Sequence, residues 1–319
     1  MLSIISARCD FRREMKEDIV IGVCAYNEEK NIHGLLDNLL TKQSISQNTK
    51  IVVICSGCTD STPKIVKRFC ERDNRVHLIL EGERKGKAAA LNILFKWASM
   101  HSLDKLVLIN ADCLPKPGSI EKLITPLHYE NVGATAGRPV PVNKRRGFPN
   151  LITHLIWDLH HKTSLYKSTK MSAELCAIRH KLVKQIPEDL ATDEPYMQML
   201  IQRRGYKISY VPEATVNIKG PDNFQELLKQ RRRICTGHLQ IKKMTGFVVP
   251  TSKPKNILPL LLRTLNPHPT KELITILIGA LLETCANLLA IYDIRKDKIP
   301  YIWESLESTK FLDIENKDG

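Results

Sequence analysis

The feature that most constrains the fold is a repeated alternation of short apolar runs with helical patterns in the first third of the chain. Between the runs, apolar residues recur at helical spacing. Strands that alternate with helices in this way form right-handed crossovers and a parallel sheet. The pattern therefore predicts an α/β domain with a mostly parallel sheet flanked by helices. Four apolar runs indicate the buried strands: Ile19–Ala25, Ile51–Cys55, Val76–Leu80 and Leu106–Ile109.

An acidic residue follows the last of these runs. Asp112 comes directly after Asn110 and Ala111, before the loop that begins at Leu114. In open α/β sheets, ligands bind outside the carboxyl ends of the strands. A carboxylate at that place is suited to hold a divalent cation against a phosphate. The alternative is that Asp112 only caps a helix or a turn before Pro115.

The overall charge favours anionic partners. The chain has 319 residues, 43% of them hydrophobic, and a formal net charge of +14. Such a charge suits nucleotide phosphates, nucleic acid or an acidic membrane surface. The nine cysteines are scattered, which indicates a reducing compartment rather than a disulfide framework. The charged residues near the N-terminus argue against a secretory signal peptide.

The second half of the chain has a less regular pattern. An acidic pair, Asp193 and Glu194, opens one of its predicted helices, where the helix dipole favours negative charge. Residues 207–211 and 214–218 suggest a hairpin or two short edge strands. The remaining predicted elements are strands over 133–140 and 173–178 and helices over 151–166, 193–205 and 224–243.

Six short motifs occur together in one order along residues 18–245. They are Ala25-Tyr26-Asn27-Glu28-Glu29, Ser56-Gly57-Cys58-Thr59-Asp60, Gly86-Lys87-Ala88-Ala89-Ala90-Leu91-Asn92, Asn110-Ala111-Asp112, Asp193-Glu194 with Gly205-Tyr206-Lys207, and Gln230-Arg231-Arg232-Arg233-Ile234. Any one of them is weak, but six in the same order are a strong signal. In these segments the chain resembles glycosyltransferase family 2, the inverting sugar transferases of GT-A fold.

The resemblance implies a nucleotide-diphosphate sugar as donor, Mg²⁺ or Mn²⁺ as cofactor, and a lipid-linked or saccharide acceptor. Asp112 is the implied metal ligand, and Asp193 or Glu194 is the implied catalytic base. Three consecutive arginines also commonly lie on a solvated helix face. A binding role for Arg231–Arg233 is therefore supported only by their position relative to Gln230 and the other motifs. The implied donor-binding residues are Ala25, Tyr26, Glu28, Ser56, Lys87, Asn110, Ala111, Gln230, Arg231 and Arg233.

Three departures from the family pattern limit what the resemblance implies. Cys55 and Ser56 stand where many members have acidic residues, one of which contacts the nucleobase, so a uridine preference is not implied. Asn110 replaces the first acidic residue of the metal motif. Ile234 replaces the Trp found in processive enzymes, which weakens an interpretation as a cellulose-synthase-like polymerase.

The segment after residue 245 has a different composition. We expect residues 1–17 to be an N-terminal extension, 18–245 the GT-A domain and 246–319 a C-terminal helical segment. Residues 273–291 are almost all apolar and long enough to cross a bilayer, but Glu283 near the middle would be costly there. An interfacial membrane helix, packing in a core or dimer, and a true membrane span all stay open.

These patterns together predict a metal-dependent inverting glycosyltransferase at the cytoplasmic face of the cell membrane. A catalytically idle GT-A scaffold is the first alternative, because Asn110 replaces an acidic residue and Asp193-Glu194 stands where the family has Glu-Asp. A thiol redox protein is less probable, although Cys55 and Cys58 form a C-x-x-C motif after a strand. Nucleic-acid binding has no recognition-helix motif to support it, so no nucleic-acid partner is expected.

Overall fold

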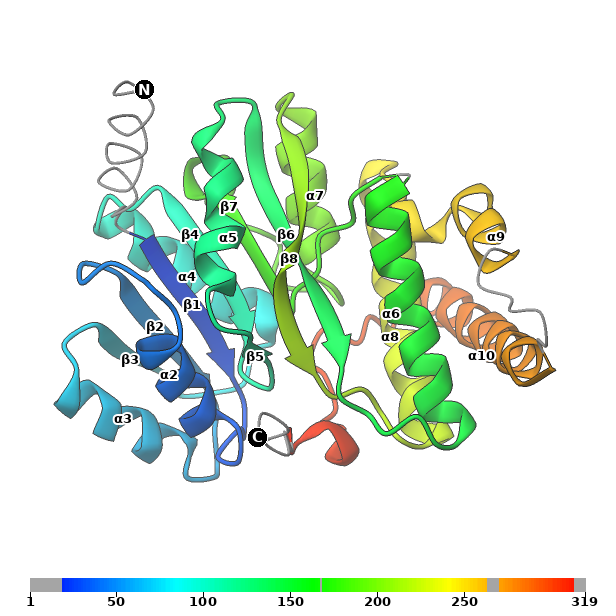
Figure 1. Cartoon of the computed structure of the whole chain (residues 1–319), viewed down its shortest axis with the longest axis horizontal. Helices are drawn as coiled ribbons and strands as arrows, with labels where there is room; N and C mark the ends of the chain where they lie inside the picture. Colours follow the sequence, from blue (N-terminus) through cyan, green and yellow to red (C-terminus); the bar gives the residue numbers. More distant parts are fainter. Residues whose placement is uncertain (1–18, 167, 263–269, 313–319) are drawn as a thin grey trace, which may run out of the picture.

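The computed structural model describes residues 19–166, 168–262 and 270–312, and these form one central sheet covered by helices on both faces (Figure 1). The strand order is β3-β2-β1-β4-β7-β6-β8-β5. The predicted N-terminal extension, 1–17, lies outside the described residues. The α/β fold class predicted from the alternating pattern is confirmed.

The N-terminal half is the predicted parallel unit. Its strands pair in parallel, with β1 between β2 and β4. Alternate residues of β1 face opposite layers: Ile21 packs with α2 and α3, and Val20 packs with α4. Both faces are therefore buried, which explains the unbroken apolar runs. The elements are β1 (Ile19–Ala25), α2 (Ile32–Thr41), β2 (Lys50–Ser56), α3 (Thr62–Arg72), β3 (Val76–Glu81), α4 (Lys87–Met100) and β4 (Lys105–Asn110).

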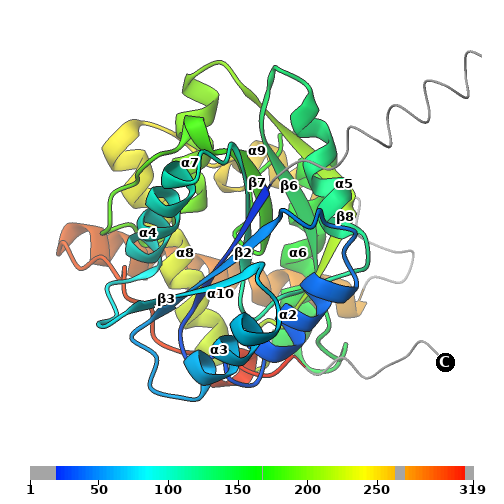
Figure 2. The ribbon, with the colours of Figure 1, turned by 90° about the vertical axis from the view of Figure 1, so that its left-hand side faces the viewer.

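The second half extends the sheet with mixed strand directions. Strand β7 runs antiparallel to both β4 and β6, whereas β6 and β8 are parallel. Figure 2 shows α7 and α4 on one side of the sheet and α2 on the other. The elements are β5 (Leu114–Pro115), α5 (Ser119–Ile124), β6 (Val132–Pro141), α6 (Phe148–Tyr166), β7 (Leu175–Arg179), α7 (Glu194–Arg203) and β8 (Lys207–Ile218).

The prediction of a hairpin or two short edge strands over 207–218 is wrong. These residues form one 12-residue strand, β8, which pairs with β6 on one side and with the two-residue β5 on the other. The register with β6 shifts between Ala136 and Arg138, whose partners on β8 are Tyr210 and Thr215. Pro212 lies in this irregular stretch, where its missing N–H breaks no ladder hydrogen bond.

Three helices follow the sheet. They are α8 (Phe224–Thr245), α9 (Pro254–Leu262) and α10 (Thr270–Arg295). The side chain of Asn223 caps α8 by accepting a hydrogen bond from the Glu226 N–H at 2.9 Å, and Gly246, with φ of 73°, ends the helix in the left-handed region. Helix α10 packs against α8 and α6. By length and composition α10 is the one described helix that could cross a membrane.

After α10 the chain turns back toward the sheet. A short 3-10 helix, Glu307–Thr309, lies in this returning segment. The segment is red in Figure 1 and passes between the N-terminal half of the sheet and the lower ends of α6 and α8. It carries the last described residues, up to Leu312.

Candidate active site

A cleft of about 230 Å³ lies at the carboxyl ends of the parallel strands. The register pairs Cys24 of β1 with Asn110 of β4 and Ala25 with Cys55 of β2, so the loops that follow these strands meet at one edge of the sheet. Helix α8 and the returning C-terminal segment form the opposite wall. Eleven of the thirteen residues predicted for the site line this cleft: Ala25, Tyr26, Glu28, Ser56, Lys87, Asn110, Ala111, Asp112, Glu194, Gln230 and Arg233.

The other two predicted residues, Asp193 and Arg231, are not among the residues that line the main cleft. Asp193 lies beneath its floor, 2% exposed, and helps to line a small neighbouring cavity. Arg231 points from α8 toward α10, where its guanidinium donates hydrogen bonds to both carboxylate oxygens of Glu283 at 2.9 and 3.0 Å. In this arrangement Asp193 lies beside Lys87 and Arg231 is paired with Glu283.

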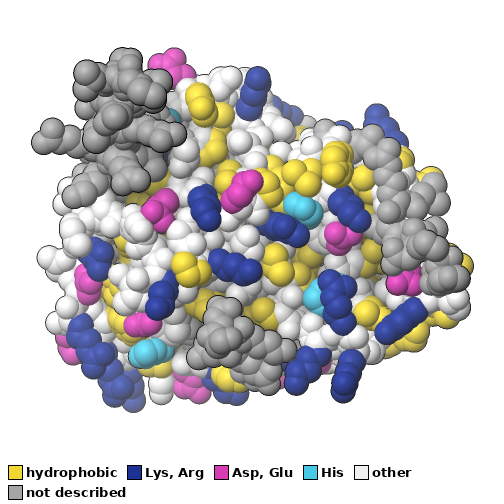
Figure 3. All heavy atoms as spheres, in the orientation of Figure 1, with side chains coloured by type: hydrophobic (Ala, Val, Ile, Leu, Met, Phe, Trp, Pro, Cys, Tyr) yellow, Lys and Arg dark blue, Asp and Glu magenta, His cyan; other side chains and the backbone are white. Residues whose placement is uncertain are grey.

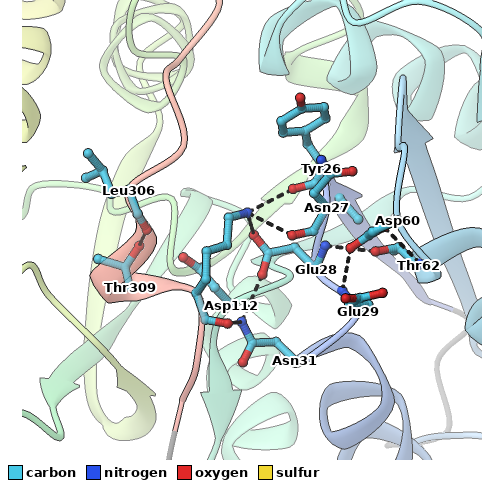
Figure 4. Close-up of polar contacts among 12 residues, drawn as sticks. Tyr26, Asn27, Glu28, Glu29, Asn31, Asp60, Thr62, Asp112, Leu306 and Thr309 are labelled. Carbon is cyan, nitrogen blue, oxygen red and sulfur yellow. Dashed lines mark hydrogen bonds and ion pairs between the residues drawn. The ribbon is translucent and has the colours of Figure 1, made fainter.

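Two carboxylates, Glu28 and Asp112, lie together on one side of the cleft (Figure 4). Asn31 donates a hydrogen bond to Glu28 at 2.8 Å, which fixes the Glu28 side chain. Burial, and then the nearby charge of Asp112, raise the pKa of Glu28 to about 7, although the ammonium group of Lys310 opposes this shift. The site thus concentrates negative charge that is balanced by a lysine from the far end of the chain.

These carboxylates suit a divalent cation that a substrate helps to bind. Among the described residues, no group of three or more His, Cys, Asp or Glu side chains is placed to hold a metal ion by itself. Mg²⁺ commonly binds through one or two carboxylates together with substrate phosphates and water. Asp112 with Glu28 beside it fits that pattern, in which the phosphate groups of a bound ligand would complete the ligand set.

Lys87 connects the metal motif to the acidic pair. Its ammonium group donates a hydrogen bond to Asn110 Oδ1 at 2.9 Å and lies 3.6 Å from Asp193 Oδ1. Burial alone would lower the pKa of Lys87, but the charges of Asp193 and Glu194 outweigh it and hold the pKa above its usual value. Lys87 is therefore a fixed positive charge on the cleft wall, and Asn110 serves it as a neutral acceptor.

Glu194 presents its side chain to the cleft. Pro195 stands in the first turn of α7, which favours a helix start here and places Asp193 and Glu194 at its N-terminus. The helix dipole favours the charged carboxylate, but burial and then the Asp193 charge raise the pKa of Glu194 to about 7. No described residue donates a hydrogen bond to the Glu194 carboxylate. Such a group accepts a proton readily near neutral pH.

The Arg233 side chain extends from α8 into the cleft, and one of its N–H groups has no hydrogen-bond partner among the described residues. Its Nε is buried and has no hydrogen-bond partner among the described residues. Its guanidinium lies 3.5 Å over the ring of Trp303. Burial lowers the pKa of Arg233 to about 10, while the carboxylates of Glu194 and Glu174 oppose that change. A buried arginine with an unused N–H is prepared to bind an anion.

Several cleft residues were not predicted from the sequence. The Arg84 guanidinium lies 3.6 Å from the centre of the Tyr26 ring. Glu174 lines the cleft and directly precedes β7. Trp303 and Lys310 come from the C-terminal segment. They donate hydrogen bonds to the carbonyl oxygens of Ala191, 112 residues away, and of Tyr26, 284 residues away. No motif marks them, and the only local signal is an aromatic residue within a polar tail.

Comparison with known proteins agrees with this geometry. The family model of glycosyl transferase family 2 matches residues 20–186. The chain is 25% identical over 242 residues to poly-beta-1,6-N-acetyl-D-glucosamine synthase of Staphylococcus aureus, covering 73% of this chain and 57% of that protein. The chain therefore spans just over half the length of that curated relative.

Solved structures share the fold. A mannosyltransferase from Pyrobaculum calidifontis, in complex with GDP-Man and Mn²⁺, aligns with a TM-score of 0.62 and 21% identity over 89% of this chain and 88% of its own. Glucosyl-3-phosphoglycerate synthase from Mycobacterium tuberculosis, in complex with Mn²⁺, UDP-Glc and phosphoglyceric acid, aligns with a TM-score of 0.50 and 19% identity over 72% and 82%. With the family model matching more than half of its residues, the chain belongs to glycosyl transferase family 2, and its fold is the GT-A fold of these solved structures.

Proposed function

We propose that this glycosyltransferase moves a sugar, with inversion, from a nucleotide-diphosphate sugar to an acceptor, assisted by a divalent cation. The observation that carries the proposal is the cleft itself. It brings the carboxylate of Asp112, the cations of Lys87 and Arg233, and the carboxylate of Glu194 into one space. Carboxylates and fixed cations in one cleft suit a reaction in which a diphosphate leaves while a proton is removed from the acceptor.

On the donor side, the proposed task is to hold the diphosphate and to stabilise the charge that it gains. Arg233 and Lys87 provide fixed positive charges, and the buried Nε–H of Arg233 has no other partner among the described residues. A bound Mg²⁺ or Mn²⁺ at Asp112 would act as a Lewis acid on the diphosphate. Gln230 and Tyr26 line the same cleft and would orient the rest of the donor.

On the acceptor side, we assign Glu194 rather than Asp193 as the base. Glu194 lines the cleft, whereas Asp193 is buried beneath it and pairs with Lys87. The Glu194 carboxylate would take the proton of an acceptor hydroxyl. The acceptor oxygen then bonds to the anomeric carbon on the face opposite the diphosphate, and the bond between that carbon and the diphosphate oxygen breaks.

The acceptor is proposed to be lipid-linked or a saccharide, reached at the cytoplasmic face of a membrane. The outward side of α10 carries exposed apolar residues, among them Leu273, Leu277, Leu281 and Leu288. Two polar residues of α10, Thr275 and Glu283, face the protein instead: Thr275 is buried and Glu283 pairs with Arg231. The cost of placing Glu283 near lipid therefore falls, which favours an interfacial helix. Lys and Arg, interspersed with Asp and Glu, are spread over the face seen in Figure 3.

Donor hydrolysis provides the decisive test. The full chain is incubated with UDP- and GDP-sugars and Mn²⁺, alongside Asp112→Ala. Turnover in the wild type that Asp112→Ala abolishes would support the proposal. Absence of turnover in both would support a catalytically idle scaffold instead.

A thermal-shift screen of UDP and GDP, with and without Mn²⁺, gives an independent measurement. A ligand that binds the native state raises the melting temperature. We expect at least one nucleotide to stabilise the protein only when Mn²⁺ is present. Equal stabilisation in the presence of a chelator would contradict the metal role of Asp112.

A further inference from the structure

The C-terminal segment crosses the cleft that the donor is proposed to occupy. Trp303, Leu306, Thr309 and Lys310 are among the residues that line it, and Figure 4 shows Leu306 and Thr309 across the cleft from Glu28. The approach is close. At Gly86, where φ is 100°, an added Cβ would lie 3.0 Å from the backbone oxygen of Tyr301.

Lys310 places its ammonium group at the proposed metal site. It forms an ion pair with Glu28 and donates hydrogen bonds to the carbonyl oxygens of Tyr26 at 2.9 Å and Asn27 at 3.0 Å, which are drawn as dashed lines in Figure 4. The side chain of Lys310 is 17% exposed and that of Glu28 is 10% exposed. A cation of the chain itself therefore neutralises a carboxylate that lies beside Asp112.

Trp303 covers the groups proposed to bind the diphosphate. Its ring lies 3.5 Å from the Arg233 guanidinium and 5.7 Å from the Lys87 ammonium. The indole N–H donates to the carbonyl oxygen of Ala191 at 3.0 Å, and Arg84 donates to the carbonyl oxygen of Trp303. The ring thus occupies space in front of two cations, and it satisfies Arg233 only by a cation–π contact.

Besides the contacts of Trp303 and Lys310, the segment is held by polar contacts near the surface. Lys229 pairs with Glu304 at 2.9 Å, and their side chains are 51% and 77% exposed. Glu226 accepts hydrogen bonds from the hydroxyl and the backbone N–H of Ser308. Exposed ion pairs of this kind contribute little to stability. A donor that brings a divalent cation and a diphosphate can replace such contacts with stronger ones.

We propose that residues 301–310 are an intramolecular competitor of the donor, with Lys310 in the place of the divalent cation and Trp303 over the diphosphate-binding cations. The inference rests on the proposed function. Donor and cation displace the segment, since Glu28 and Arg233 cannot serve both occupants. When the donor leaves, the segment returns and shields the cluster of charges from unproductive ligands.

Calorimetric titration of the full chain with Mg²⁺ and UDP or GDP tests this competition. Lys310→Met keeps the length of the side chain but removes its charge, and Lys298→Met makes the same change at an exposed lysine outside the cleft. If the closed arrangement is about tenfold more populated than the open one, Lys310→Met tightens the apparent Kd about tenfold. Lys298→Met should leave the Kd unchanged. Unchanged or weaker binding in Lys310→Met would overturn the inference.

Tryptophan emission tests the movement directly. The chain has three tryptophans, and Trp303 is the one in the displaced segment. Saturating Mg²⁺ and nucleotide should shift the emission to longer wavelength as Trp303 enters water, and Trp303→Phe should abolish that shift. Emission that stays constant at saturation would show that the segment does not move and would refute the proposal.

The two proposals fail in different ways. If neither the wild type nor Lys310→Met binds any nucleoside diphosphate with Mg²⁺, the proposed function and this inference are both wrong. If both proteins bind with the same Kd and without a shift in emission, the glycosyltransferase proposal stands and only the competition is wrong.

Discussion

Charged side chains on the two sides of helix α8 differ in whether they have partners within the protein. On the side facing α10, Arg231 and Arg232 each bind one carboxylate through two hydrogen bonds, with Glu283 and Asp293 respectively. On the side facing the cleft, Arg233 has a buried, unpartnered Nε, and Glu194 has a raised pKa. Paired charges hold helices together, whereas buried charges kept without a partner mark the place where a ligand is expected.

Among these predictions, replacing Glu194 should have the largest effect on kcat. Glu194→Gln keeps the shape of the side chain but removes the proton acceptor, so we expect kcat to fall by about 10²–10⁴-fold with a hydroxyl acceptor. Asp193→Asn, as the matched variant, removes the partner of Lys87 and should have the smaller effect. Steady-state kinetics compare the two. A larger loss in Asp193→Asn would reverse our assignment of the base.

Arginine substitutions on the two sides of α8 should separate stability from binding. Arg231→Met leaves Glu283 without its partner, and because Glu283 is 40% exposed we expect a loss of only about 2 kcal/mol in unfolding free energy. Arg233→Met removes a guanidinium whose buried Nε has no hydrogen-bond partner among the described residues, so stability should change less while nucleotide affinity falls. Urea unfolding and nucleotide titration measure both quantities. Equal destabilisation by the two substitutions would remove the distinction between the regions.

The pH dependence should follow the raised pKa of Glu194. The base works only when deprotonated, so kcat should fall as the pH drops through about 7 and approach a tenfold decrease per pH unit below it. Glu194→Gln should lack this limb of the profile. If the acceptor were a phosphate that is already ionised, the limb would be shallow in the wild type as well, which would distinguish the two acceptor classes.

The smallest effect concerns the outward face of α10. Leu281→Gln should weaken binding to anionic vesicles by about tenfold, because it removes about 1.4 kcal/mol of apolar burial in the interface. Leu80→Gln is the control, since Leu80 and Leu281 are both 65% exposed but Leu80 lies on β3 at the other end of the sheet. Cosedimentation measures both variants. An equal response would argue against α10 as the membrane-binding surface.

Local patterns predicted most of the N-terminal half. The apolar run 19–25 matches β1 residue for residue, because both faces of a parallel sheet are buried and the signal is continuous. The strand over 207–218 was misjudged as two pieces. Pro212 interrupts the local pattern, and only the register with β6 shows that the strand continues through it.

Sequence patterns were sufficient to predict the parallel unit, the family and the set of residues at the strand ends, since these depend on short-range periodicity and on motif spacing. Which member of each pair faces the cleft, Glu194 rather than Asp193 and Arg233 rather than Arg231, became known from the folded arrangement. It alone brought Trp303 and Lys310 to the site. Neighbouring residues on a helix point in directions about 100° apart, and contacts across hundreds of residues leave no local pattern to detect.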